Sequence, residues 1–156
     1  MKKKNIEDHK LVDQYSKRLI ETIKQDKYSE INSLYKKLFL TWKNKKTIYI
    51  CGNGGSAGNA NHIANDLIFA AGKKNKKGLK VESLASNPAI LTCLANDIGY
   101  ENIFSEQLKV KGAKGDLLIL LSGSGNSKNI INAVKMAKKL DILTFAILGF
   151  NGGKCK

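Results

Sequence analysis

The chain lacks several features that define whole classes of protein. No apolar run approaches the ~20 residues that a membrane-spanning helix requires, and the basic start "MKKKNIEDHK" leads into an amphipathic pattern rather than the apolar core of a signal peptide. We therefore expect a cytoplasmic protein with no membrane partner. The three cysteines form no CxxC pair, and the two histidines are too few to complete a Cys/His zinc site. We expect Cys51, Cys93 and Cys155 to be buried or incidental thiols.

Arginine is almost absent, although the chain is strongly basic. The formal net charge is +14, and Arg18 is the only arginine. Surfaces that recognise bases or bind nucleic-acid phosphates commonly use the bidentate guanidinium group of arginine. We therefore interpret the lysines as solvated surface residues and expect no nucleic acid as partner. The charge can still attract an anionic small substrate. The densest run, Lys73–Lys80, is interpreted first as an exposed helix-to-strand connection and second as a phosphate or acidic-partner patch.

Hydrophobic periodicity predicts an α/β fold. Apolar residues recur at helical spacing over 11–23 and 31–42, and beyond them apolar runs alternate with helical segments. This alternation implies parallel pairing, and runs such as "LLILL" are typical of a sheet covered on both faces. We expect one domain over 1–156, with two N-terminal helices in 1–45 and a doubly wound parallel sheet in 46–156. Since the chain stops just after its last strand, we expect a further helix to follow. The expected strands are 47–51, 79–84, 116–121 and 142–148, and the expected helices of the core are 56–71, 88–96, 101–111 and 127–140.

The first expected strand ends in a loop of glycines, "CGNGGSAGNA". Gly52, Gly54 and Gly55 permit positive φ and close approach to backbone N–H groups, and Ser56 is placed to cap the following helix. Such a loop is typical of an anion site. A tight turn without a ligand and a dinucleotide fingerprint are the alternatives. The fingerprint needs an acidic residue at the end of the next strand, but Glu82 falls inside that strand, so we expect no NAD.

A second loop at the end of the third expected strand strengthens the anion-site interpretation. In "LLSGSGNSKN", three serines and Asn126 stand beside free backbone N–H groups and a helix N-terminus. Hydroxyls and amides suit a phosphate monoester, whereas a plain N-cap turn needs only one serine. The carboxyl ends of parallel strands lie at the same edge of a sheet, so the two loops together predict one pocket.

A lone histidine lies on the helix after the first loop. His62 and Asp66 are four residues apart, and Asn59 precedes His62 by three, so the three side chains share one helix face. An imidazole and a carboxylate there could move protons or hold a metal. The alternative is an exposed helical pair of the kind that contributes a few tenths of a kcal/mol.

Asn96 and Asp97 end the next helical segment just before Gly99. Their turn could extend toward the same edge of the sheet. As a bare dipeptide, however, Asn-Asp is a common helix terminator.

Four ordered motifs resemble the sugar isomerase (SIS) domain, most closely its phosphoheptose isomerase branch: "GNGGSAGNANHIANDL", "NDIGYENIF", "SGSGNS" and "GGK". The resemblance covers essentially the whole chain. It implies a flavodoxin-like sheet, a homotetramer, and conversion of sedoheptulose 7-phosphate to D-glycero-D-manno-heptose 7-phosphate for bacterial surface polysaccharide. It also implies that His62 and Asp66 match a zinc-ligand histidine and a glutamate that is both ligand and catalytic base. The implied substrate contacts are Asn53, Gly54, Gly55, Ser56, Asn96, Asp97, Ser122, Gly123, Ser124 and Ser127.

The sequence departs from the family's pattern at several points. Asp66 replaces the glutamate, Ala70 stands where an arginine is often found, and Gly123 where a threonine is usual. The family's last helix, which supplies a further glutamine and histidine to the metal, has no counterpart within 1–156, so we expect these residues to give an incomplete zinc ligand set. Two kinds of function therefore remain: a sugar-phosphate isomerase with Asp66 as base and His62 as metal ligand or orienting group, or a non-catalytic protein. The latter includes a phosphosugar-binding protein, an adaptor of the type that binds the replication initiator, and a truncated inactive isomerase.

Overall fold

The computed structural model describes residues 2–24, 28–69, 71 and 77–156, in two compact units, Met1–Tyr35 and Lys36–Lys156. The first unit contains α1 (Lys2–Lys24), and α2 (Tyr28–Lys43) crosses the division between the units. Both helices were expected from the spacing of their apolar residues. In the part of the chain that the structure describes, no helix has the length and apolarity that crossing a membrane requires.

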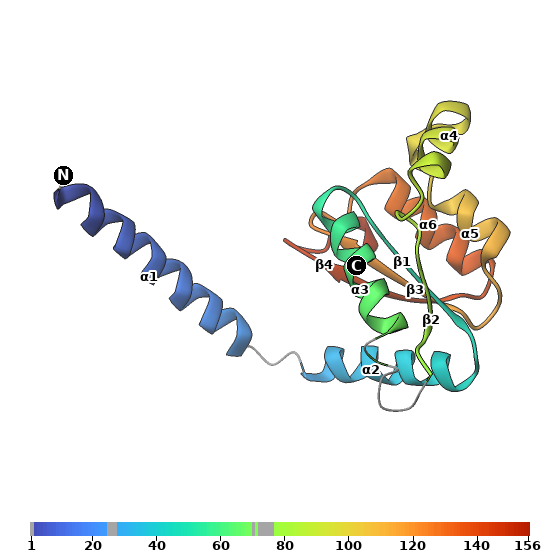
Figure 1. Cartoon of the computed structure of the whole chain (residues 1–156), viewed down its shortest axis with the longest axis horizontal. Helices are drawn as coiled ribbons and strands as arrows, with labels where there is room; N and C mark the ends of the chain where they lie inside the picture. The colour runs from blue at the N-terminus through green and yellow to red at the C-terminus, as the bar shows by residue number, and fades with distance from the viewer. Residues whose placement is uncertain (1, 25–27, 70, 72–76) are drawn as a thin grey trace. The chain divides into compact units, whose positions relative to one another are not determined.

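The second unit is built on a parallel sheet (Figure 1). Its strand order is β2-β1-β3-β4, and every pair is parallel, as expected. The central strand β1 pairs with neighbours on both sides, so that Ile50 lies opposite both Ser83 and Ile119. This order places the ends of β1 and β3 next to each other, and with them the two loops. The strands are β1 (Thr47–Gly52), β2 (Lys80–Ser83), β3 (Leu117–Ser122) and β4 (Leu143–Leu148).

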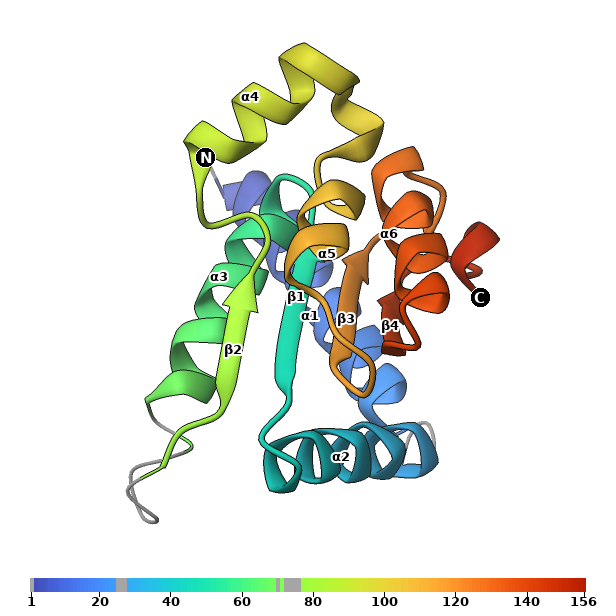
Figure 2. The same ribbon diagram turned by 90° about the vertical axis from the view of Figure 1, so that its right-hand side faces the viewer.

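Helices cover both faces of the sheet. Figure 2 shows α3 on one side, α5 and α6 on the other, and α4 across the end of the sheet where β2 points. The doubly wound prediction is thus confirmed. The helical elements of this unit are α3 (Gly55–Ile68), α4 (Pro88–Ile98), the 3₁₀ turn η1 (Tyr100–Asn102), α5 (Ser105–Lys111), α6 (Lys128–Lys139) and the 3₁₀ turn η2 (Gly153–Cys155).

The alternation of side chains along the strands divides the core into two layers. Successive residues of a strand point to opposite faces. In β1, Tyr49 and Cys51 lie on the face of the sheet opposite α3. They belong to the large buried cluster that also contains Phe104 and Ile130. The intervening Ile48 and Ile50 are also at most 1% exposed, so the strand is buried on both sides. This explains why its sequence is apolar without a break.

One expected helix, over 101–111, is divided in the structure. The 3₁₀ turn η1 is followed by a turn that buries Ile103 and Phe104, which are 2% and 1% exposed, and α5 begins only at Ser105. Apolar burial of a large side chain stabilises by about 1.5–3 kcal/mol. This exceeds the gain from continuing a regular helix through the segment, so the prediction of one uninterrupted helix is wrong.

Candidate functional site

The glycine loop, residues 52–55, connects β1 to α3 through a tight turn. A Cβ at Gly52 would lie 2.7 Å from the Cβ of Ser56, so the close approach of strand and helix requires glycine there. Gly54 has a φ of 54° and occupies the N-cap position, with no side-chain cap. The expectation that Ser56 caps the helix is therefore wrong, because α3 begins one residue earlier at Gly55. Ser56 instead donates its backbone N–H to the carbonyl of Asn53 at 3.0 Å.

The loop after β3, residues 122–127, is called the serine loop here, and hydrogen bonds to its own hydroxyls hold its conformation. Ser122 Oγ accepts the backbone N–H of Gly125 at 3.0 Å, and Ser124 Oγ accepts that of Asn126 at 3.2 Å. A hydroxyl that accepts such a bond still has its own O–H to donate. Ser127 lies at the N-cap of α6, but its side chain makes no cap hydrogen bond. The loop thus presents hydroxyl donors at a helix N-terminus, which suits a phosphate group.

The C-terminal turn packs directly against this serine loop. A Cβ at Gly125, whose φ is 64°, would lie 1.9 Å from the carbonyl oxygen of Gly152. A Cβ at Gly153 would lie 2.3 Å from the carbonyl oxygen of Ser124. The backbone N–H of Lys154 donates to Asn126 Oδ1 at 3.1 Å. Gly125 and Gly153 are needed because two backbone segments meet there without room for side chains.

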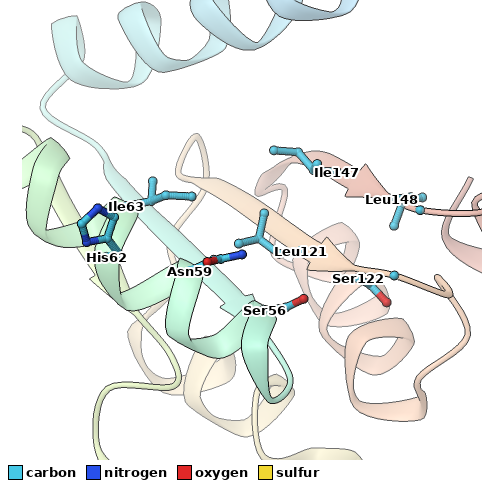
Figure 3. Close-up of a pocket in the computed structure, with 10 residues that line it drawn as sticks. Ser56, Asn59, His62, Ile63, Leu121, Ser122, Ile147 and Leu148 are labelled. Atoms are coloured by element: carbon cyan, nitrogen blue, oxygen red, sulfur yellow. The ribbon is translucent and has the colours of Figure 1, made fainter. Parts of the chain in front are cut away.

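One cavity of about 400 Å³ lies between α3 and the start of the serine loop after β3 (Figure 3), and no residue of 52–55 lines it. Ser56, Asn59 and His62 line it from α3, on the opposite side from Ser122 (Figure 3), and Gly123 also lines it. A volume of this size lies within the range of small-molecule sites, ~300–1,000 Å³. The cavity thus has polar groups on two sides and an apolar floor. The remaining lining residues are Ile63, Leu121, Ile147, Leu148 and Gly149.

His62 and Asp66, the predicted pair on α3, lie close together at the edge of this cavity. His62 Nε2 and Asp66 Oδ2 lie 3.5 Å apart, and their side chains are 77% and 55% exposed. His62 lines the cavity, whereas Asp66 stands one helical turn further along, outside the lining. Of the pair, only His62 is among the lining residues, and Figure 3 shows its imidazole at the outer edge of the cavity, turned away from Leu121 and Ile147.

Most of the other predicted site residues do not line the cavity. All ten predicted substrate contacts are among the residues that the structure describes, and only Ser56, Ser122 and Gly123 line the cavity. Asn96 and Asp97 lie in the last turn of α4, where Asn96 Nδ2 donates to Asp97 Oδ1 at 2.8 Å. The Asp97 carboxylate also accepts from the Cys93 thiol at 3.6 Å, and this hydrogen bond raises the pKa of the thiol.

Asn53 is held away from the cavity by residues that sequence reasoning missed. Its side-chain amide pairs with the amide of Asn129 on α6 and accepts a hydrogen bond from the Tyr100 hydroxyl. The apolar floor was missed as well, although Leu148 and Gly149 follow the rule that ligand sites lie at the carboxyl ends of strands. Asn53 and Asn129 are 76 residues apart, and no sequence spacing signals such a pair.

The donors present do not fit a zinc site by themselves. Zinc takes about four protein ligands, or three and a water. His62 and Asp66 supply two, and among the residues described here no group of three or more His, Cys, Asp and Glu side chains comes together to hold a metal. Ala70, the position at which the family often has arginine, lies outside the described residues.

The basic run Lys73–Lys80 is described only from Lys77 onward. Lys77 and Lys80 are exposed, as expected for a surface connection. They also border a separate cavity of about 630 Å³ before β1 and β2, at the amino ends of the strands. It is lined by Trp42, Lys43, Lys45, Lys46, Lys77, Gly78 and Lys80.

Comparison with known proteins identifies the class to which this fold and site belong. The SIS domain matches residues 13–149, and the chain belongs to that family. Within it, the chain is similar to phosphoheptose isomerases. That of Helicobacter pylori (strain Shi470) is 45% identical over 119 residues, which are 76% of this chain and 62% of the relative. That of Chlorobaculum parvum is 39% identical over 140 residues, 89% of this chain and 67% of the relative.

Solved structures agree with these sequence relatives. The phosphoheptose isomerase of Neisseria gonorrhoeae superposes with a TM-score of 0.80 at 30% identity, over 99% of this chain and 79% of the other. That of Francisella tularensis gives a TM-score of 0.85 at 27% identity, over 95% and 78% of the two chains. The expected fold and the expected branch of the family are thereby confirmed. The chain spans 62% of the length of the Helicobacter relative.

Proposed function

We propose that this protein is a phosphoheptose isomerase that interconverts sedoheptulose 7-phosphate and D-glycero-D-manno-heptose 7-phosphate in the cytoplasm, for bacterial surface heptose. The relatives' names support this reaction class. One observation of the structure carries the proposal: a hydroxyl-bearing loop and an imidazole-bearing helix face border the same cavity. Stability of the fold alone does not require these polar groups to lie around the same cavity.

The serine loop is the proposed phosphate site. Ser122, Ser124 and Ser127 can donate hydroxyl protons to phosphate oxygens, and the N-terminus of α6 adds its positive end. Ser56 would approach from the other side of the cavity, together with the backbone of Gly54 and Gly55. A Cβ at Gly123 would meet no atom within 4 Å, so the space that threonine takes elsewhere in the family is open in this chain.

We assign proton transfer to the pair His62 and Asp66. The reaction removes a proton from C1 of the ketose, and the electron pair left behind forms the C1=C2 bond of an enediol as the C2 oxygen takes a proton. Return of a proton to C2, with loss of the proton on the C1 oxygen, gives the aldose. Asp66 is the proposed base, and His62, which lines the cavity with its Nε2 3.5 Å from Asp66 Oδ2, is the proposed orienting group. Asn96 and Asp97 would approach the substrate from α4.

Zinc and a tetramer are further parts of the proposal. The two donors of this chain suffice for zinc only if other ligands join them, so no step of the reaction is assigned to a metal here. The helix α1 supports assembly, because its large apolar side chains are exposed, and exposed apolar stripes mark interaction surfaces. Light scattering of the purified chain should give the mass of four copies. The exposed apolar residues of α1 are Leu11, Val12, Tyr15, Leu19, Ile20 and Ile23.

The decisive experiment follows the proton. Purified protein is incubated with sedoheptulose 7-phosphate in deuterated water, with and without zinc, and NMR is used to detect aldose signals and deuterium at C2. We expect exchange in the wild type and a loss of about 100-fold or more in Asp66→Asn, because the neutral amide of asparagine cannot accept the substrate proton. Asp13→Asn, a carboxylate on α1, is the matched control. Calorimetric binding without exchange in the wild type would refute the isomerase and leave a phosphosugar-binding protein.

A further inference from the structure

Three hydrogen bonds join three distant segments beside the glycine loop. Asn53 Nδ2 donates to Asn129 Oδ1 at 3.0 Å, and Asn129 Nδ2 donates back to Asn53 Oδ1 at 2.8 Å. The hydroxyl of Tyr100, in η1, donates to the same Asn53 Oδ1 at 3.0 Å. We call these three residues the amide clasp. They connect the loop after β1, the first turn of α6 and the segment after α4.

The orientation of both amides is determined by one backbone group. The N–H of Ile130 donates to Asn129 Oδ1 at 2.9 Å, so the atom of Asn129 in that position must be the oxygen. Asn129 therefore turns its NH₂ toward Asn53, which must answer with its own oxygen. That oxygen then accepts two hydrogen bonds, which fills both of its lone pairs.

This arrangement limits what Asn53 can do for a substrate. Its side-chain oxygen is occupied, and its NH₂ retains a single N–H that is not used within the clasp. The backbone carbonyl of Asn53 accepts from Ser56 N–H at 3.0 Å and so shapes the turn that brings Ser56 to the cavity. Asn53 thus serves mainly through the loop conformation that it holds.

Asn129 anchors the glycine loop from α6, through its two hydrogen bonds with Asn53. It is 1% exposed, stands two residues after Ser127, and does not line the cavity. An amide buried this deeply is stable only because its partners satisfy it, and a lost partner leaves an unsatisfied polar group. The clasp therefore ties the glycine loop to the start of the serine loop's helix.

The geometry points to Asn129 as a positioning residue that sets the spacing between the glycine loop and the phosphate-binding serine loop, with Tyr100 as its third support. The inference rests on the proposed function for the identity of the substrate. Its structural content, that the two loops are held together by this amide pair, is independent of which anion binds.

The test compares two leucine substitutions on the same helix. Asn129→Leu removes both amide bonds at nearly constant volume. The matched control is Asn132→Leu, one turn away, where the amide donates to the Glu101 carbonyl at 3.0 Å and makes no bond to Asn53. We expect the Kd and KM for sedoheptulose 7-phosphate to rise about 10- to 100-fold in Asn129→Leu, with a smaller change in kcat, because misplacement of binding groups by ~1 Å costs up to ~100-fold. Asn132→Leu should stay within about threefold.

A readout without substrate separates this inference from the proposed function. Amide hydrogen exchange should accelerate over 52–56 and 122–127 together in Asn129→Leu, and over neither in Asn132→Leu. If the wild type binds no sugar phosphate, the proposed function fails, and the exchange experiment alone decides the clasp. If both loops keep wild-type protection and affinity in Asn129→Leu, the clasp is refuted.

Tyr100→Phe provides a milder variant in case Asn129→Leu does not fold. It removes one hydroxyl from a side chain that is 56% exposed, so the fold should survive. We expect about two- to fivefold weaker binding and faster exchange over 52–56, in keeping with the loss of one hydrogen bond. Unchanged affinity and exchange in Tyr100→Phe, combined with a failure of Asn129→Leu to fold, would also overturn the assignment.

Discussion

Gly125 provides the sharpest test of how the serine loop is built. Alanine at this position adds a Cβ that would lie 1.9 Å from the carbonyl oxygen of Gly152 and 2.7 Å from its carbonyl carbon. Neither atom belongs to a flexible side chain, so one of the two backbone segments must move. The φ of 64° adds a second cost, because the left-handed region disfavours residues with a Cβ by about 1–2 kcal/mol.

The expected loss of stability follows from these two terms. Overpacking of a filled site costs about 1–3 kcal/mol, so Gly125→Ala should lower the free energy of unfolding by about 2–5 kcal/mol in total. For a chain of this size, each kcal/mol lowers Tm by about 2–4 °C. We therefore expect a fall of roughly 4–20 °C by differential scanning calorimetry.

The control lies two residues earlier in the same loop. A Cβ at Gly123 would meet nothing within 4 Å, and its φ is not positive, so Gly123→Ala should leave Tm unchanged within about 2 °C. A Gly125→Ala protein that melts together with Gly123→Ala would show that the turn at Gly152 does not press on the serine loop. The packing argument for the "GGK" motif would then be wrong.

Two further predictions concern ionisable groups in the core and on α4. Burial raises the pKa of Tyr49, whose hydroxyl donates to the Lys111 carbonyl at 2.8 Å. The stability that this group contributes is present below its unfolded pKa of about 10 and is lost as the pH rises through its higher folded pKa. Alkaline unfolding, monitored by circular dichroism, should therefore shift to higher pH in Tyr49→Phe, and an unchanged profile would contradict this. Burial also raises the pKa of the Cys51 thiol, which is 0% exposed, whereas Cys93 is exposed. An aromatic disulfide reagent should therefore modify Cys93 in the native protein and Cys51 only on unfolding. Equal labelling rates for the two thiols would refute the burial argument.

Much of the fold could be predicted because its signals are local. The apolar runs at Thr47–Gly52 and Leu117–Ser122 are long enough, and apolar enough on both faces, to indicate buried parallel strands. The helix-forming pattern of α3 likewise placed His62 and Asp66 on one face, and the structure brings them to 3.5 Å. Element boundaries were less accurate, since Gly54 replaced Ser56 as the N-cap.

The errors and omissions come from interactions that no local pattern encodes. The break between η1 and α5 exists because Ile103 and Phe104 are drawn into a core built by other segments. Ile63 is an apolar residue of α3, yet it lines the cavity and does not belong to the buried core cluster. In each case the partner surface, not the helix's own sequence, decides which side is buried.

The sequence by itself determined which segments become strands and helices, and that two hydroxyl- and glycine-rich loops lie at one edge of a parallel sheet, because periodicity and backbone preference act within a few residues. Only the tertiary structure decided that His62 rather than Asp66 lies at the edge of the cavity, that Asn53 is bound by Asn129, and that the final glycines pack against the serine loop. These are contacts between segments tens of residues apart, and their geometry depends on how the whole core packs.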